Sequence, residues 1–200
     1  MKRKGFLLTC VALTVLLAGC GNKVSKEDTT SVSVDKNGKV YSTVVDTLDK
    51  EYYDTDELHA MIIAEIESYN EKESSEKVTL DAADLTKEKS VVTMSYADAD
   101  SYAAFNDMIF FQGTVAEAGE AGYDLDPGQL QSADIDGKEV DMEALLGAED
   151  TRVLILEEPI QVHTYGIIKA MSGNVTILNK KEAAVTEAED GQPGILLFKP

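Results

Sequence analysis

The segment SVSVDKNGKVYSTV, residues 31–44, carries the clearest fold signal in the chain. Apolar and polar side chains alternate over 31–34 and again over 39–44, which is the pattern of strands with one buried face. Asn37-Gly38 lies between the two runs and suits the two positive φ angles of a tight hairpin turn. The segment therefore predicts an antiparallel hairpin at the start of the folded domain.

A helix is predicted from Asp54 to about Lys72. Asp54 can cap the first turn, Glu57 has the spacing of a capping box, and Tyr53 and Leu58 are placed for a hydrophobic staple. An apolar stripe at helical spacing follows, formed by Leu58, Met61, Ile62, Ile66 and Tyr69. Such a stripe usually packs into the core, and the alternative is a surface that binds a partner.

Strands and short helices are predicted through the middle of the chain. Strands at 78–80 and 91–96 flank a polar turn near 87–89. A helix capped by Asp98 should then turn Tyr102 and Phe105 inward.

A further strand over 109–111 should end at Gly113. Residues 117–141 are rich in glycine and acidic side chains and are predicted to be mostly loop. A short helix over 142–146 should stop at Gly147.

The last third is predicted to be β-rich. Residues 153–156 are apolar throughout, as in a strand that is covered on both faces. Further short strands are expected at 160–163, 166–168, 174–178 and 195–198, and such closely spaced strands pair antiparallel. The sequence therefore predicts an α+β fold: one domain over 31–200, with a mostly antiparallel sheet and two to three packed helices.

The charge balance excludes one class of partner. The chain has 18 Lys+Arg and 37 Asp+Glu, a formal net charge of −19. A basic face that neutralises phosphates is therefore excluded, and with it the usual mode of nucleic-acid binding. A polybasic attachment to anionic lipid is excluded on the same ground.

The N-terminus has the pattern of a secretory signal. Lys2-Arg3-Lys4 is followed by a largely apolar run over 6–18. This run is shorter than the roughly 20 residues that span a bilayer, and its charge, length and small terminal residues fit a cleaved leader. Leu17-Ala18-Gly19-Cys20 resembles the lipobox of bacterial lipoproteins.

The lipobox resemblance implies cleavage before Cys20 and a diacylglycerol thioether on its sulfur. The expected parts are a signal peptide over 1–19, a flexible tether over 20–30 and the domain. Acyl chains on Cys20 would hold the protein on the membrane, facing outside the cytoplasm. Residues 96–106 together with 195–199 resemble uncharacterised lipoproteins of anaerobic Gram-positive bacteria, which implies a location and no activity.

The two histidines of the chain are its first candidates for catalytic or metal-binding side chains. His59 lies off the apolar stripe and is expected to be exposed, and His163 is expected to be a hydrogen-bonded structural group at a strand end. The sequence contains no HExxH, G-x-S-x-G or phosphate-binding loop motif. No cofactor or metal site is therefore expected.

The acidic stretch over 97–150 has 14 acidic residues and one basic residue. Asp124-Leu125-Asp126 and Asp134-Ile135-Asp136-Gly137 could contribute oxygen ligands to calcium. Neither matches a complete calcium loop, so a solvated charged loop is favoured.

A non-enzymatic, membrane-anchored binding or envelope-associated module is the predicted function. The alternative is a small envelope hydrolase that uses a pair of acidic residues. A two-lobed solute receptor would need a longer chain. A binding module should expose an apolar or aromatic patch, for which Tyr52, Tyr53 and Tyr123 are candidates.

Overall fold

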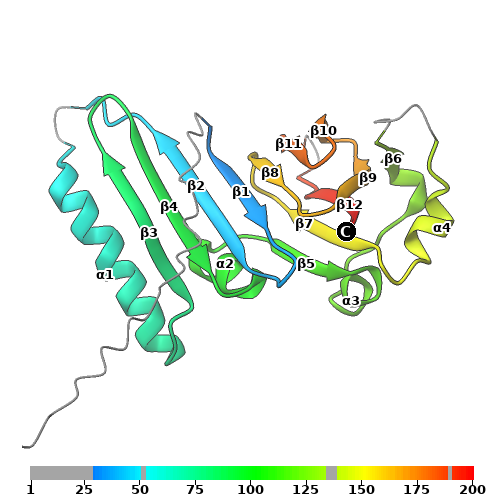
Figure 1. The fold of residues 1–200 in the computed structure, drawn as a ribbon, viewed down its shortest axis with the longest axis horizontal. Helices are drawn as coiled ribbons and strands as arrows, with labels where there is room; N and C mark the ends of the chain where they lie inside the picture. Colours follow the sequence, from blue (N-terminus) through cyan, green and yellow to red (C-terminus); the bar gives the residue numbers. More distant parts are fainter. Residues whose placement is uncertain (1–28, 51–52, 134–138, 189–190) are drawn as a thin grey trace, which may run out of the picture.

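Two mostly antiparallel sheets form the molecule (Figure 1). The computed structural model describes residues 29–50, 53–133, 139–188 and 191–200. The first sheet has the strand order β10-β11-β8-β1-β2-β4-β3, with bounds Val175–Asn179, Glu182–Val185, Gln161–His163, Ser31–Val34, Val40–Asp46, Ser90–Tyr96 and Val78–Leu85. The second has the order β5-β7-β12-β9-β6, with bounds Phe110–Thr114, Arg152–Leu156, Gly194–Lys199, Ile167–Ser172 and Leu130–Ser132.

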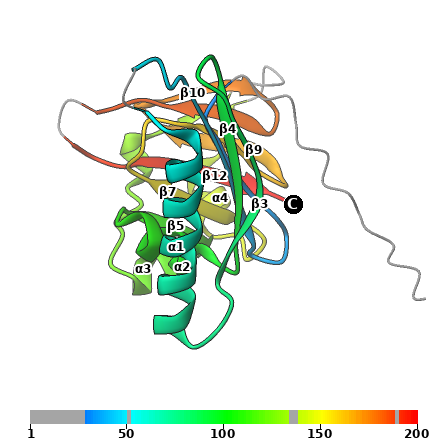
Figure 2. The same ribbon diagram turned by 90° about the vertical axis from the view of Figure 1, so that its left-hand side faces the viewer.

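Four α-helices accompany the sheets in the described part of the chain. They are α1 (Thr55–Glu73), α2 (Ala99–Asn106), α3 (Val115–Glu120) and α4 (Met142–Leu146), and a 3₁₀ turn covers Pro127–Gln129. The long helix α1 lies along the outer part of the first sheet, beside β3 (Figures 1 and 2). The α+β class and the single domain predicted from the sequence are confirmed.

The predicted hairpin is present as β1 and β2, with Val34 paired to Val40. Its turn differs from the prediction, because Gly38 has a positive φ of 86° and Asn37 does not. The Asp35 amide donates to the Lys39 carbonyl at 2.9 Å, and the Gly38 amide donates to the Asp35 carbonyl at 3.1 Å. The loop is therefore longer than a two-residue turn and needs one left-handed residue, at Gly38.

The second sheet is covered on both faces. On β7, Leu154 and Leu156 belong to the main core, whereas Val153 and Ile155 face a smaller cluster that includes Ala118 of α3. All four of these β7 side chains are at most 1% exposed. The unbroken apolar run over 153–156 follows from this double burial.

A chain of aromatic rings joins the helices to the first sheet. The Tyr96 ring lies 4.8 Å from the Tyr102 ring and 5.9 Å from the Phe105 ring, measured between centroids. Phe105 also meets Tyr69 of α1 edge-on at 5.4 Å. Such edge-to-face pairs stabilise beyond their buried area, so α1, α2 and β4 are held together at this level of the sheet. The inward orientation predicted for Tyr102 and Phe105 is confirmed.

Asn70 fixes the C-terminal end of α1 to the start of β3. Its side-chain oxygen accepts from the Lys77 and Val78 amides at 2.8 and 3.0 Å, and its Nδ2 donates to the Val78 carbonyl at 2.8 Å. At the other end, the Asp54 carboxylate accepts from the Asp56 and Glu57 amides, as predicted. The reciprocal bonds of a capping box are formed at α3 instead, between Thr114 and Glu117.

Several elements differ from the sequence prediction. The strands are divided between two sheets, and β1 pairs parallel with β8 although most pairs are antiparallel. Gly113 lies inside β5 and does not end it, because the strand continues to Thr114, the N-cap of α3. Helix α3 and strand β11 lie in segments where no element was predicted. Both are short, and glycine or alanine replaces the periodic large apolar residues that indicate an element.

Candidate functional site

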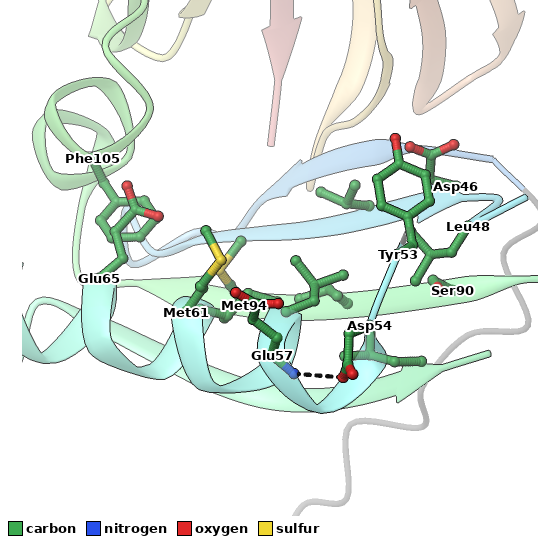
Figure 3. Close-up of a pocket in the computed structure, with 15 residues that line it drawn as sticks. Asp46, Leu48, Tyr53, Asp54, Glu57, Met61, Glu65, Ser90, Met94 and Phe105 are labelled. Carbon is green, nitrogen blue, oxygen red and sulfur yellow. Dashed lines mark hydrogen bonds between the residues drawn. The ribbon is translucent and has the colours of Figure 1, made fainter. Parts of the chain in front are cut away.

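An open groove of about 600 Å³ lies between the N-terminal half of α1 and the first sheet (Figure 3). This α1 groove is lined by Val44, Asp46, Leu48, Tyr53, Asp54, Glu57, Leu58, Met61, Ile62, Glu65, Leu85, Ser90, Val92, Met94 and Phe105. Its volume falls within the range of ordinary ligand sites.

Strand register builds the floor of the groove. Val44 of β2 pairs with Val92 of β4, and the two neighbouring pairs on the same face bring in Ser90 and Met94. One face of a sheet presents alternate residues, so this face continues to Val40 and Tyr96, which are paired and fully buried. The same sheet face is therefore closed under α2 and the C-terminal half of α1, and open under the N-terminal half.

Helix α1 contributes two rows of side chains. Residues four apart lie on one ridge of a helix, so Leu58, Ile62 and Ile66 form one row and Glu57, Met61 and Glu65 form the next. Ile66 is buried and Ile62 packs against the main core, whereas Met61 is 61% exposed. The predicted apolar stripe is therefore divided: its C-terminal part belongs to the core, and its N-terminal part lines the groove.

Three of the six exposed large apolar side chains in the described part of the chain line the groove. Val44 is 41% exposed and Tyr53 is 39% exposed, and both line it together with Met61. Met61 and Met94 add unbranched thioether side chains, which adapt to ligands of different shapes. An apolar surface that folding leaves open is the usual mark of an interaction site.

The charged side chains that line the groove are all acidic. Asp46, Asp54, Glu57 and Glu65 contribute carboxylates, and no Lys, Arg or His is among the lining residues of this described site. Figure 3 shows Glu57, Met61 and Glu65 in succession along α1, with Asp46 and Tyr53 toward one end of the groove. Asp54 also caps the helix, so its carboxylate has a structural role as well.

The three tyrosines predicted as candidates for an exposed patch lie in different places. Tyr53 lines the groove, Tyr123 packs on Phe111 with ring centroids 5.3 Å apart, and Tyr52 lies outside the described residues. Asp46 and Met94 were not singled out from the sequence. They reach the site only through the pairing of β2 with β4, which no local pattern reveals.

The two histidines lie apart from the groove lining. His59 is exposed on α1, as predicted. His163 lies at the end of β8 opposite Glu182 of β11, with its Nδ1 3.3 Å from the glutamate Oε1. This contact fits the structural role that was predicted for His163.

A second hollow of about 560 Å³ lies beside Asp124 and Asp126. Asp126 accepts from the Gly128 amide at 2.8 Å and caps the 3₁₀ turn. Residues 134–138 lie outside the described part, so the second predicted calcium segment has no structural account. Within the described ranges, His, Cys, Asp and Glu side chains form no group of three or more that could hold a metal ion.

Three carboxyl groups outside the groove have lowered pKa values. Burial raises the pKa of Asp98, but hydrogen bonds from Ser101 and Lys77 outweigh it. The Thr114 amide and hydroxyl lower the pKa of Glu117, and the Lys199 ammonium lowers that of Asp150. These groups cap helices or form an ion pair, so none of the three supplies the raised pKa that a glycosidase general acid needs.

Cys20 and the preceding leader lie outside the described residues. Of the helices that the structure describes, none is both long and apolar enough to cross a membrane. Comparison of the chain with protein-family models, with curated proteins and with solved structures gave no match.

Proposed function

We propose that the protein is a membrane-anchored extracytoplasmic lipoprotein whose α+β domain binds a ligand in the α1 groove without transforming it. The observation that carries the binding function is the groove itself: an open apolar floor, rimmed by carboxylates, on a sheet face that is buried where it continues to Val40 and Tyr96. Tyr53, which the sequence marked as an exposed aromatic candidate, lies on this surface.

The start of the domain supports a site close to the anchor. Thr30 is bonded to Val45 through its hydroxyl, which accepts from the Val45 amide at 3.0 Å and donates to the Val45 carbonyl at 3.1 Å. Val44 and Asp46, on either side of Val45, line the groove. With acyl chains on Cys20, a flexible tether of about 11 residues would allow roughly 18 Å between lipid and domain. The open end of the groove would then lie on the side of the domain from which the tether leaves.

Replacing Cys20 with serine tests the anchor. A thiolate is the nucleophile that takes the lipid, so we expect labelled palmitate to enter the wild-type chain in its host and to be absent from Cys20→Ser. Cys10, which belongs to the leader, gives the matched control: Cys10→Ser should label as wild type does. Equal labelling of the Cys20→Ser protein would contradict the anchor.

A neutral apolar fluorophore tests the groove. N-phenyl-1-naphthylamine should brighten on binding to the chain that starts at residue 20, which keeps every described residue. Met61→Asp should weaken this binding at least fivefold, because it places a charge over the apolar floor. Ile63→Asp is the control, since Ile63 is 36% exposed on the same helix but does not line the groove. Equal weakening by both variants, or no binding by wild type, would contradict a ligand site here.

A further inference from the structure

We infer that the α1 groove takes a basic amphipathic peptide segment, with apolar side chains on the floor and Lys or Arg side chains at the rim. This inference rests on the proposed binding function and names its ligand class. Two properties of the groove carry it: the sign of the charges that line it and their spacing along the helix.

The sign of the charge excludes anionic ligands. Asp46, Asp54, Glu57 and Glu65 line the groove, and the described lining has no cationic side chain to receive a phosphate or a fatty-acid carboxylate. A second copy of this chain is also opposed, because each chain carries a formal net charge of −19. A ligand that covers the apolar floor must therefore place no negative charge at the rim. A ligand with positive charge there should bind more tightly.

The spacing of the carboxylates favours a peptide over a small cation. Glu57 and Glu65 are eight residues apart on α1, about 12 Å along the axis at 1.5 Å per residue. Met61 lies between them on the same ridge. Asp46 lies across the groove at the end of β2. One small cation reaches one of these carboxylates, whereas a helix with basic residues two turns apart reaches Glu57 and Glu65 together and covers Met61 with the apolar residue between them.

The apolar floor distinguishes the α1 groove from the rest of the acidic protein surface. Val44, Met61 and Met94 accept apolar side chains, which a uniformly charged surface would not do. Helix-in-groove recognition uses apolar anchors at positions i, i+3, i+4 and i+7 of the bound helix. The ligand should therefore need both features, and a basic peptide without apolar residues should bind weakly.

Three fluorescent peptides of equal length provide the test: a Leu/Lys amphipathic helix, the same helix with Glu in place of Lys, and a Ser/Lys peptide without Leu. We expect the Leu/Lys peptide to bind the chain from residue 20 onward, measured by anisotropy, and to weaken as salt is raised. The other two should bind at least tenfold more weakly. Equal binding of the Ser/Lys peptide would overturn the inference, because the apolar floor would then have no part in binding.

Two triple variants separate the groove from net charge. Asp46→Asn with Glu57→Gln and Glu65→Gln should weaken the Leu/Lys peptide at least tenfold. Asp124→Asn with Glu143→Gln and Glu187→Gln changes the net charge equally at exposed positions outside the groove, and should stay within twofold of wild type. Asp54 is left unchanged because it caps α1.

The outcomes distinguish this inference from the proposed function. The ligand class would be overturned if the two triple variants weakened binding of the Leu/Lys peptide equally, or if neither variant weakened it. Binding of the neutral fluorophore without binding of the Leu/Lys peptide would overturn the ligand class and leave the groove a binding site. Failure of both probes would overturn both proposals.

Discussion

Tyr96→Ala is expected to lower the free energy of unfolding by about 3–5 kcal/mol, the range for removing a large aromatic side chain from a core. Tyr96 has no exposed surface, and its ring packs edge-on against Tyr102 and Phe105. Typical domains unfold at a cost of only 5–15 kcal/mol. The substitution should therefore remove a large part of the stability, measured by urea unfolding.

Tyr96→Phe separates the ring from the hydroxyl group. The Tyr96 oxygen lies 3.4 Å from Ser42 Oγ and 3.7 Å from Met94 Sδ, both long contacts. Loss of this hydroxyl should cost about 1 kcal/mol or less. A cost for Tyr96→Phe close to that of Tyr96→Ala would contradict the role given to the ring.

Tyr96→Ala should also weaken ligand binding in the α1 groove. Phe105 lines the groove and rests on the Tyr96 ring. Without that ring, Phe105 loses one of its two aromatic partners and keeps only Tyr69. The Tyr96→Ala protein should therefore bind N-phenyl-1-naphthylamine more weakly even where it remains folded.

Gly166→Ala should destabilise the protein by about 3 kcal/mol, at the upper end of the usual cost of overpacking. An added Cβ would lie 2.5 Å from the Lys199 carbonyl carbon and 2.8 Å from Phe198 Cδ2, and it would overlap the Lys199 carbonyl oxygen. Backbone atoms cannot move aside as the end of a flexible side chain can. Strand β12 would have to shift, although it pairs with β7 on one side and β9 on the other.

Gly119→Ala is the matched control for the glycine substitution. Gly119 lies within α3, and an added Cβ would meet no atom within 4 Å. Alanine favours a helix interior over glycine by roughly 0.5–1 kcal/mol. Thermal unfolding should therefore show a lower midpoint for Gly166→Ala and an equal or higher one for Gly119→Ala. A Gly166→Ala protein as stable as wild type would contradict the close approach to β12.

The groove and the proposed anchor give the molecule a direction. The open end of the groove and the bonded start of the domain at Thr30 lie at one level of the first sheet, whereas Asn70 fixes α1 at the opposite level. In the proposed lipoprotein, the ligand would meet the domain on the side from which the tether leaves. A basic peptide segment close to the outer face of the membrane would then be within reach of the groove.

Local sequence patterns were sufficient for most of the elements. The Asp54 and Asp98 caps and the stop at Gly147 depend on neighbouring residues, which interact whatever the rest of the chain does. The strand over 153–156 was recognisable because its run of apolar residues is unbroken. The hairpin at Asn37-Gly38 was also predicted, but not its loop type, because the Asp35 carboxylate determines the closure through bonds to the Asn37 and Lys39 amides.

The tertiary structure alone decided how the strands divide and where the site lies. Nothing in the local pattern of β8 specifies a parallel partner 130 residues earlier along the chain, at Ser31 opposite Gln161. The sequence by itself determined the acidity, the helix α1 and its apolar stripe. Whether that stripe is core or surface depended on where Asn70 fixes the helix and how far α2 covers the sheet. Both features depend on contacts between segments that are remote in sequence, and the periodicity of a local segment carries no information about such contacts.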